Sequence, residues 1–189
     1  MNTPEATPPR VARLKQLLFT TEEEPVYAIL DGASVPELLE RLAIAKEEHV
    51  CLYRGELGPD LARMAPYLVK LRQESPFTDW ILSEGWGNHW GIFTTAPVGL
   101  EAMRRHLRHF LRVKDPAGQI LYFRYYDPRV LRVYLPTCNV RELQFVYGPA
   151  GRYVCEGAKA AEALAFAFEE QELKVTTTLL ATNGAGGSG

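Results

Sequence analysis

The stretch VYAILDGASVPELLERLAIAKEEHVCLY, residues 26–53, decides the fold class. Its first five residues form an apolar run that is typical of a buried strand, and Asp31-Gly32 ends it. Ser34 can cap a helix with Pro36 in its first turn. That helix has apolar residues at helical spacing: Leu38, Leu39, Leu42 and Ala45. A second apolar run at 49–53 follows, so strand, crossover helix and strand predict a parallel, right-handed pair.

The rest of the chain continues this alternation of helices and strands. Apolar residues at helical spacing predict helices over residues 10–19, 60–64, 77–83, 100–112, 129–134, 140–147 and 158–172. Short apolar runs predict strands at 66–71, 90–94, 119–125 and 152–155. The expected fold is therefore α/β: a mixed, partly parallel sheet flanked by helices, with a small helical C-terminal part.

Four regions are expected along the chain. They are an N-terminal extension and helix (1–25), a core domain (26–150), a short helical C-terminal part (151–179) and a flexible Gly-rich tail (180–189). The first nine residues are rich in Pro and Thr, which is typical of disorder. With 189 residues, 47% of them hydrophobic, the chain can bury an ordinary globular core.

The sequence lacks a signal peptide, a membrane-spanning segment and paired cysteines, and these features bear on the cellular compartment and on the redox state of the thiols. The N-terminus has no apolar signal core, and no apolar run approaches the roughly 20 residues that a membrane-spanning helix needs. The three cysteines, Cys51, Cys138 and Cys155, are odd in number and form no CxxC pair. We therefore expect reduced, structural thiols in a cytoplasmic protein without a membrane partner.

The distribution of charge is more informative than the net charge of −2. Residues 101–141 carry nine Lys and Arg against three Asp and Glu, whereas residues 21–60 carry three against ten. Arg104, Arg108 and Arg112 recur every four residues, which predicts one stripe along a helix. A solvated face is the simplest interpretation. An acidic protein partner is the next, because Arg is favoured in forked carboxylate pairs. Nucleic acid is disfavoured, since no recognition motif accompanies the basic run.

Three tryptophans and one histidine lie within residues 80–90. Glycines on both sides of Trp86 permit a tight turn, and His89 lies between Trp86 and Trp90. Tryptophans can fill a core or anchor an interface, and both possibilities stay open here. The same alternatives apply to Tyr122, Tyr125, Tyr126 and Tyr134. Asp127 can cap the helix that begins at Pro128, or pair with Arg124 and Arg129.

The sequence has no recognisable catalytic, cofactor or metal-binding pattern. Gly32-Ala-Ser34 is not a GxSxG elbow, and neither GxGxxG nor a Walker sequence is present. His106 and His109 lack the further ligands that a zinc site needs. We therefore expect no enzyme, no cofactor and no metal. The alternative is a small-molecule enzyme with a carboxylate site near Asp31, Glu56 and Glu84, followed by a nucleic-acid-binding regulator.

Several segments in the middle of the chain resemble a known family. They are YAILDGA (27–33), LYRGELG (52–58), APYLVKL (65–71), FTDWILSEGWGNHWGIF (77–93), RRHLRHFLRVKDPAG (104–118) and LYFRYYDPRVLRVYLPT (121–137). In this order they resemble the effector-adaptor family of bacterial type VI secretion, long described only as a domain of unknown function. The resemblance covers roughly residues 26–150.

This resemblance implies a chaperone that binds a toxic effector and helps load it onto the secretion spike protein, VgrG. The mechanism would be binding and release of protein partners. The residues expected to contact a partner are aromatic or basic: Trp86, His89, Trp90, Arg104, Arg108, Arg112, Arg124, Tyr125, Tyr126 and Arg129.

Overall fold

The computed structural model describes residues 8–114 and 117–180, so the expectations for residues 1–7 and 181–189 lie outside it. Its α-helices are α1 (Pro9–Leu18), α2 (Leu38–Ala45), α3 (Pro59–Met64), α4 (Pro76–Trp80), α5 (Leu100–Leu107), α6 (Pro128–Tyr134) and α7 (Val140–Tyr147). Its strands are β1 (Val26–Asp31), β2 (His49–Cys51), β3 (Pro66–Leu71), β4 (Gly91–Thr95), β5 (Arg112–Lys114), β6 (Ile120–Tyr122), β7 (Arg152–Glu156), β8 (Glu162–Glu169) and β9 (Glu172–Leu179). The α/β class is thus confirmed.

Seven strands form one sheet in the order β2-β3-β1-β4-β7-β8-β9, and β5 and β6 form a separate hairpin. Every strand pair in the described residues is antiparallel, so the prediction of a partly parallel sheet is wrong. The reason lies in β3, which pairs with β1 on one side and with β2 on the other. Strands β1 and β2 therefore run in the same direction, as a crossover helix requires, but β3 separates them.

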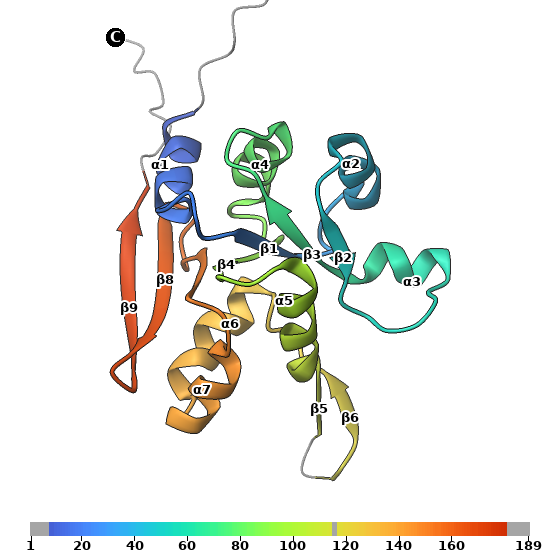
Figure 1. The fold of residues 1–189 in the computed structure, drawn as a ribbon, viewed down its shortest axis with the longest axis vertical. Coiled ribbons are helices and arrows are strands. Elements are labelled where there is room, and N and C mark those ends of the chain that lie inside the picture. Colours follow the sequence, from blue (N-terminus) through green and yellow to red (C-terminus); the bar gives the residue numbers. More distant parts are fainter. Residues whose placement is uncertain (1–7, 115–116, 181–189) are drawn as a thin grey trace, which may run out of the picture.

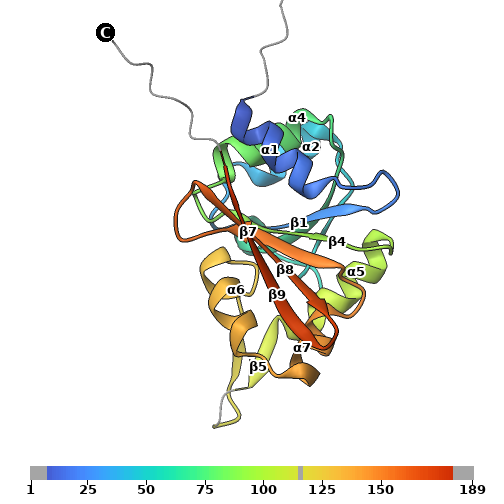
Figure 2. The same cartoon turned by 90° about the vertical axis from the view of Figure 1, so that its left-hand side faces the viewer.

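Helices cover both faces of this sheet (Figures 1 and 2). Helices α1, α2 and α4 lie on one face, and α5, α6 and α7 lie on the other. Strand β1 contributes to both cores because its side chains alternate: Val26, Ala28 and Leu30 pack with the first set of helices. Tyr27 and Ile29 pack on the opposite face. All six residues of β1 are buried, which explains the uninterrupted apolar run in the sequence.

The C-terminal part is a β-hairpin, so the prediction of a helix at 158–172 is wrong. Successive side chains of β8 point to opposite faces, which is the pattern of a strand. Ala163 and Ala165 pack in one core, whereas Leu164 and Phe166 pack in the other. Glu170 and Gln171 have positive φ values of 54° and 65°, as in a two-residue hairpin turn. Strands β7, β8 and β9 continue the same sheet, and therefore do not form a separate helical lobe.

Other sequence expectations hold with local changes. The predicted helices over 10–19, 129–134 and 140–147 are confirmed as α1, α6 and α7. Ser34 does not cap α2, because its hydroxyl donates to the Asp31 carboxylate at 2.8 Å. The predicted helix over 100–112 is divided: α5 ends at Leu107, a 3₁₀ turn covers Arg108–Phe110, and β5 begins at Arg112. No helix in the described ranges has the length and apolar character to cross a membrane.

Candidate functional site

A groove opens between α3 and the β5–β6 hairpin, where the hairpin projects from the body of the molecule (Figure 1). We call it the hairpin groove. It has a volume of about 490 Å³. Its apolar lining comes from the end of β2, the loop to α3, α3 itself and the hairpin: Leu52, Tyr53, Leu57, Leu61, Leu111, Val113, Ile120 and Tyr122. The rings of Tyr53 and Tyr122 lie 5.3 Å apart and join the two sides.

The rest of the lining is basic: Arg54, Arg108, His109 and Arg112. None of the lining residues within 8–114 and 117–180 carries a carboxylate. In the part of the chain that the structure describes, neither Arg54 nor Arg112 takes part in an ion pair. The pKa of Arg108 is lowered, first by burial and then by repulsion from Arg104 and Arg54. The groove therefore combines apolar walls with a concentration of positive charge.

Arg108 is held by the protein itself. Its guanidinium donates to the carbonyl oxygens of Leu52 at 2.8 Å and Cys51 at 3.1 Å, and also to that of Tyr53. These carbonyls belong to the last residue of β2 and the two residues after it, so Arg108 fixes the start of the loop that forms one wall of the groove. Arg104 pairs with Glu101 at 3.2 Å. Because α5 ends before Arg108, Arg104, Arg108 and Arg112 do not form the expected stripe along one helix. Arg108 and Arg112 both line the groove instead.

The loop containing Trp86 and Trp90 is built mainly by internal contacts. Trp86 is buried, stacks on Phe93 and donates from Nε1 to the Ala160 carbonyl at 3.0 Å. His89 has a positive φ of 58° and contacts the buried carboxylate of Glu156 through Nδ1. The Trp90 ring lies 4.9 Å from that of Trp80. Trp86 and His89 therefore have structural roles within the protein, and partner contact by this loop stays a prediction.

Tyr125 and Tyr126 are also core residues and were expected at a partner surface. Both side chains are buried, and the Tyr125 hydroxyl donates to the Leu107 carbonyl at 3.1 Å. Burial raises the pKa of both phenols. Their rings fill space beneath α5 and are closed to a partner, which corrects this part of the expectation.

Arg124 and Arg129 each pair with a buried carboxylate. Arg124 contacts Asp31 at the end of β1. Asp127 accepts from the Arg129 backbone nitrogen at 2.9 Å and from its guanidinium at 3.0 and 2.7 Å. Asp127 therefore caps α6 and forms the ion pair at the same time. Burial raises the pKa of Asp127, but the bonds from Arg129 outweigh it and hold that pKa below its usual value.

The three carboxylates of the enzyme alternative lie in different settings. Asp31 is buried against Arg124, and Glu56 is exposed in the loop before α3. Glu84 lines a separate cavity of about 320 Å³ that includes neither of the other two. Among the described residues, no group of three or more His, Cys, Asp and Glu side chains is placed to hold a metal ion. The enzyme alternative stays an untested prediction.

Only Arg108 and Arg112 of the groove lining were among the residues expected to contact a partner. The other ten lining residues were not: Leu52, Tyr53, Arg54, Leu57, Leu61, His109, Leu111, Val113, Ile120 and Tyr122. One signal was present: Ile120-Leu-Tyr122 is a run of three apolar residues, and the strand that it forms lies outside the main sheet. All three side chains are exposed. The convergence with residues 52–61 depends on the fold and has no local signal.

Fold and groove define an α/β domain with an antiparallel sheet and an open apolar and basic groove. The family model described as "Domain of unknown function (DUF4123)" matches residues 26–144, which is more than half of the chain. The chain therefore belongs to the DUF4123 family. No curated protein and no solved structure matches it. The match ends within α7, so β7, β8 and β9 lie beyond it.

Proposed function

We propose that this protein is a cytoplasmic adaptor that binds a type VI secretion effector and helps load it onto the VgrG spike. Two independent observations support this function. One is membership of the DUF4123 family, together with the resemblance of the segments between residues 27 and 137 to the effector adaptors. The other is the hairpin groove, which supplies a surface suited to a protein partner.

The observation that carries the proposal is a concentration of exposed apolar side chains around the hairpin groove. Tyr122 is 63% exposed, Leu61 49% and Ile120 48%, and Val113, Leu121 and Met64 are exposed beside them. Single exposed apolar residues are ordinary, but a contiguous group with a polar rim is typical of a protein-binding surface. Covering these side chains on association removes apolar area from water and favours a complex.

In this mechanism the protein works by binding and release. The seven-stranded sheet and its two cores hold the groove walls in place, and Arg108 fixes the β2–α3 loop against the end of α5. An effector segment is shielded in the groove until the complex docks on the spike. The three cysteines are free, as a reducing cytoplasm requires.

Co-expression with the cognate effector tests this function. The two proteins should elute as one peak in size-exclusion chromatography, and adding VgrG should shift that peak or leave a ternary complex in a pull-down. The matched control is an unrelated effector of similar size and charge. Separate elution of two folded proteins at micromolar concentration would contradict the adaptor function.

A further inference from the structure

We propose that the hairpin groove binds an amphipathic helix of the partner protein, with an apolar face toward α3 and the hairpin and carboxylates toward Arg54 and Arg112. This inference rests on the proposed function and specifies the partner segment. Its evidence is the composition of the groove lining, which combines eight apolar or aromatic side chains with four basic ones.

The extent of the apolar surface favours a macromolecular segment over a small amphiphile. Leu61, Ile120 and Tyr122 line the cavity and are about half exposed. Met64 is exposed nearby on α3 but lies outside the lining, so a molecule contained in the cavity leaves it in water. A helix laid along the groove reaches beyond the cavity and covers it.

The orientation of the hairpin favours a helix over an extended strand. Ile120 and Tyr122 are two residues apart on one face of β6, and Arg112 is paired with Tyr122 on the same face. The hairpin thus presents side chains to the groove, whereas an added strand needs a free backbone edge. A segment held by side chains alone must satisfy its own backbone hydrogen bonds, and a helix does so.

The charge of the groove identifies the polar part of the partner helix. Arg54 and Arg112 carry guanidinium groups that lack an ion-pair partner within residues 8–114 and 117–180. Glu56 belongs to the same loop as Arg54, and Asp60 to the same helix as Leu61, but neither carboxylate lines the cavity. Carboxylates on the incoming helix accept forked hydrogen bonds from these arginines and offset their mutual repulsion.

Peptide binding to the full chain tests this inference without the effector. The probe is a fluorescent helical peptide of about 18 residues, because shorter helices are marginal in water. It has leucines on one face and glutamates along one margin of that face. The first comparison peptide replaces every glutamate with lysine, and the second scrambles the acidic sequence so that no apolar face remains. In fluorescence anisotropy the acidic amphipathic peptide should bind at least about tenfold more tightly than either comparison peptide. Its affinity should decrease as salt is added.

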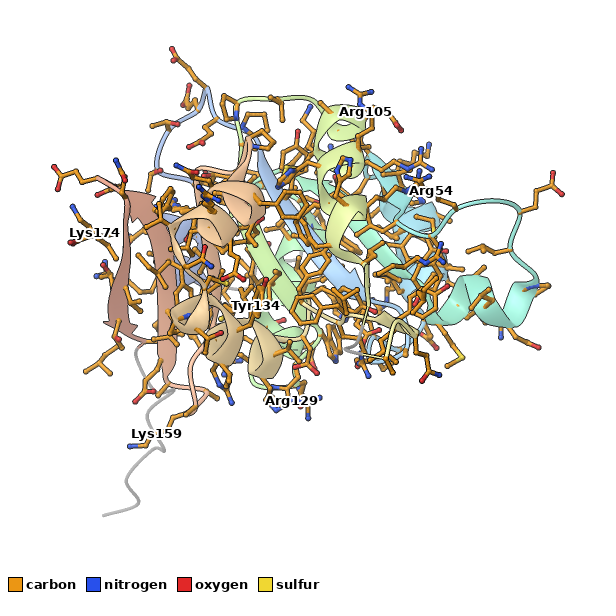
Figure 3. All side chains as sticks on the ribbon, turned by 90° about the horizontal axis from the view of Figure 1, so that it is seen from below. Arg54, Arg105, Arg129, Tyr134, Lys159 and Lys174 are labelled. Atoms are coloured by element: carbon orange, nitrogen blue, oxygen red, sulfur yellow. The ribbon has the colours of Figure 1, made fainter. Side chains whose placement is uncertain are left out.

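Matched variants of the protein locate the binding site. The double variant Arg54→Glu, Arg112→Glu should bind the acidic peptide at least about tenfold more weakly than the wild type does. Arg105→Glu reverses one charge on α5 outside the groove, half the change of the double variant, and should leave the affinity for the peptide nearly unchanged. Arg54 and Arg105 lie on the same side of the molecule, far from Lys174 on β9 (Figure 3), so Arg105 also controls for a general effect of local charge. Leu61→Ser tests the apolar wall, and Ile44→Ser, an exposed residue of α2, is its control.

Each result separates this inference from the proposed function. The proposal of an acidic partner helix is overturned if the acidic and basic peptides bind equally well. It is also overturned if the double variant keeps its melting temperature and loses no affinity for the acidic peptide. Stronger binding of sodium laurate, with displacement of the peptide, overturns it in favour of a small amphiphile. If the effector co-elutes equally with wild type and the double variant, the groove assignment fails while the adaptor function stands. If peptide binding follows the expectation but no effector binds the wild type, the adaptor function fails and the groove assignment stands.

Discussion

Replacing Arg108 with alanine should destabilise the fold, although the residue lines an exposed groove. The guanidinium donates to three successive carbonyls, those of Cys51, Leu52 and Tyr53, and joins the end of β2 to the end of α5. A hydrogen bond from a charged donor contributes about 1.5–3 kcal/mol. Water can reach part of this half-buried side chain and replace some of the bonds, so we expect a total loss of about 2–3 kcal/mol in the free energy of unfolding.

Thermal unfolding followed by circular dichroism measures this loss. For a chain of this size, 1 kcal/mol corresponds to about 2–4 °C in Tm, so Arg108→Ala should lower Tm by roughly 4–12 °C. Arg105→Ala removes an exposed arginine from the last turn of α5, three residues before Arg108, and should change stability by no more than about 0.5 kcal/mol. Arg108→Lys should fall between the two, because one ammonium cannot span three carbonyls. A Tm for Arg108→Ala equal to that of Arg105→Ala would refute the structural role.

Three further predictions concern other buried groups. Burial raises the pKa of the Cys155 thiol to about 12, so a thiol reagent should label it more slowly than Cys51 or Cys138, and urea should abolish that difference. Burial lowers the pKa of His106, so the unfolded chain takes up its proton first and stability should fall as pH falls below about 6.5. His106→Gln, which keeps a donor for the Val146 carbonyl, should flatten that decrease in urea titrations at several pH values. Asp127→Ala removes the α6 cap and the pair with Arg129, and should cost about 1–2 kcal/mol by the same method, whereas Asn should retain part of the cap.

Sequence patterns predicted the elements of this fold better than their arrangement. Hydrophobic periodicity located β1, β3, β4 and most helices, because each of these segments buries a face that its own residues specify. Strand order depends on partners far apart in the chain, and nothing local to residues 26–53 shows that β3 separates β1 from β2. The alanines of β8 suggested a helix, and only their alternation with Leu164 and Phe166 indicated a strand.

The candidate site was predicted in part. The basic residues Arg108 and Arg112 were identified from charge alone, and both line the groove. Their different roles could not be predicted, because the carbonyls that hold Arg108 belong to a loop more than 50 residues earlier in the chain. Tyr125 and Tyr126 were expected at the surface because an aromatic residue in a basic segment has the same local pattern whether it is buried or exposed.

The position of β1 at the middle of the sheet also matters during synthesis. Its two neighbours are β3 and β4, and the first of these begins at Pro66, roughly 35 residues after β1 ends. A ribosome adds about 5–20 residues per second, so this largely apolar strand, which is buried along its whole length in the finished fold, waits for about 2–7 seconds without either partner. Substitutions that slow the formation of β3 should therefore reduce the yield of folded protein in the cell before they change the stability of the finished molecule.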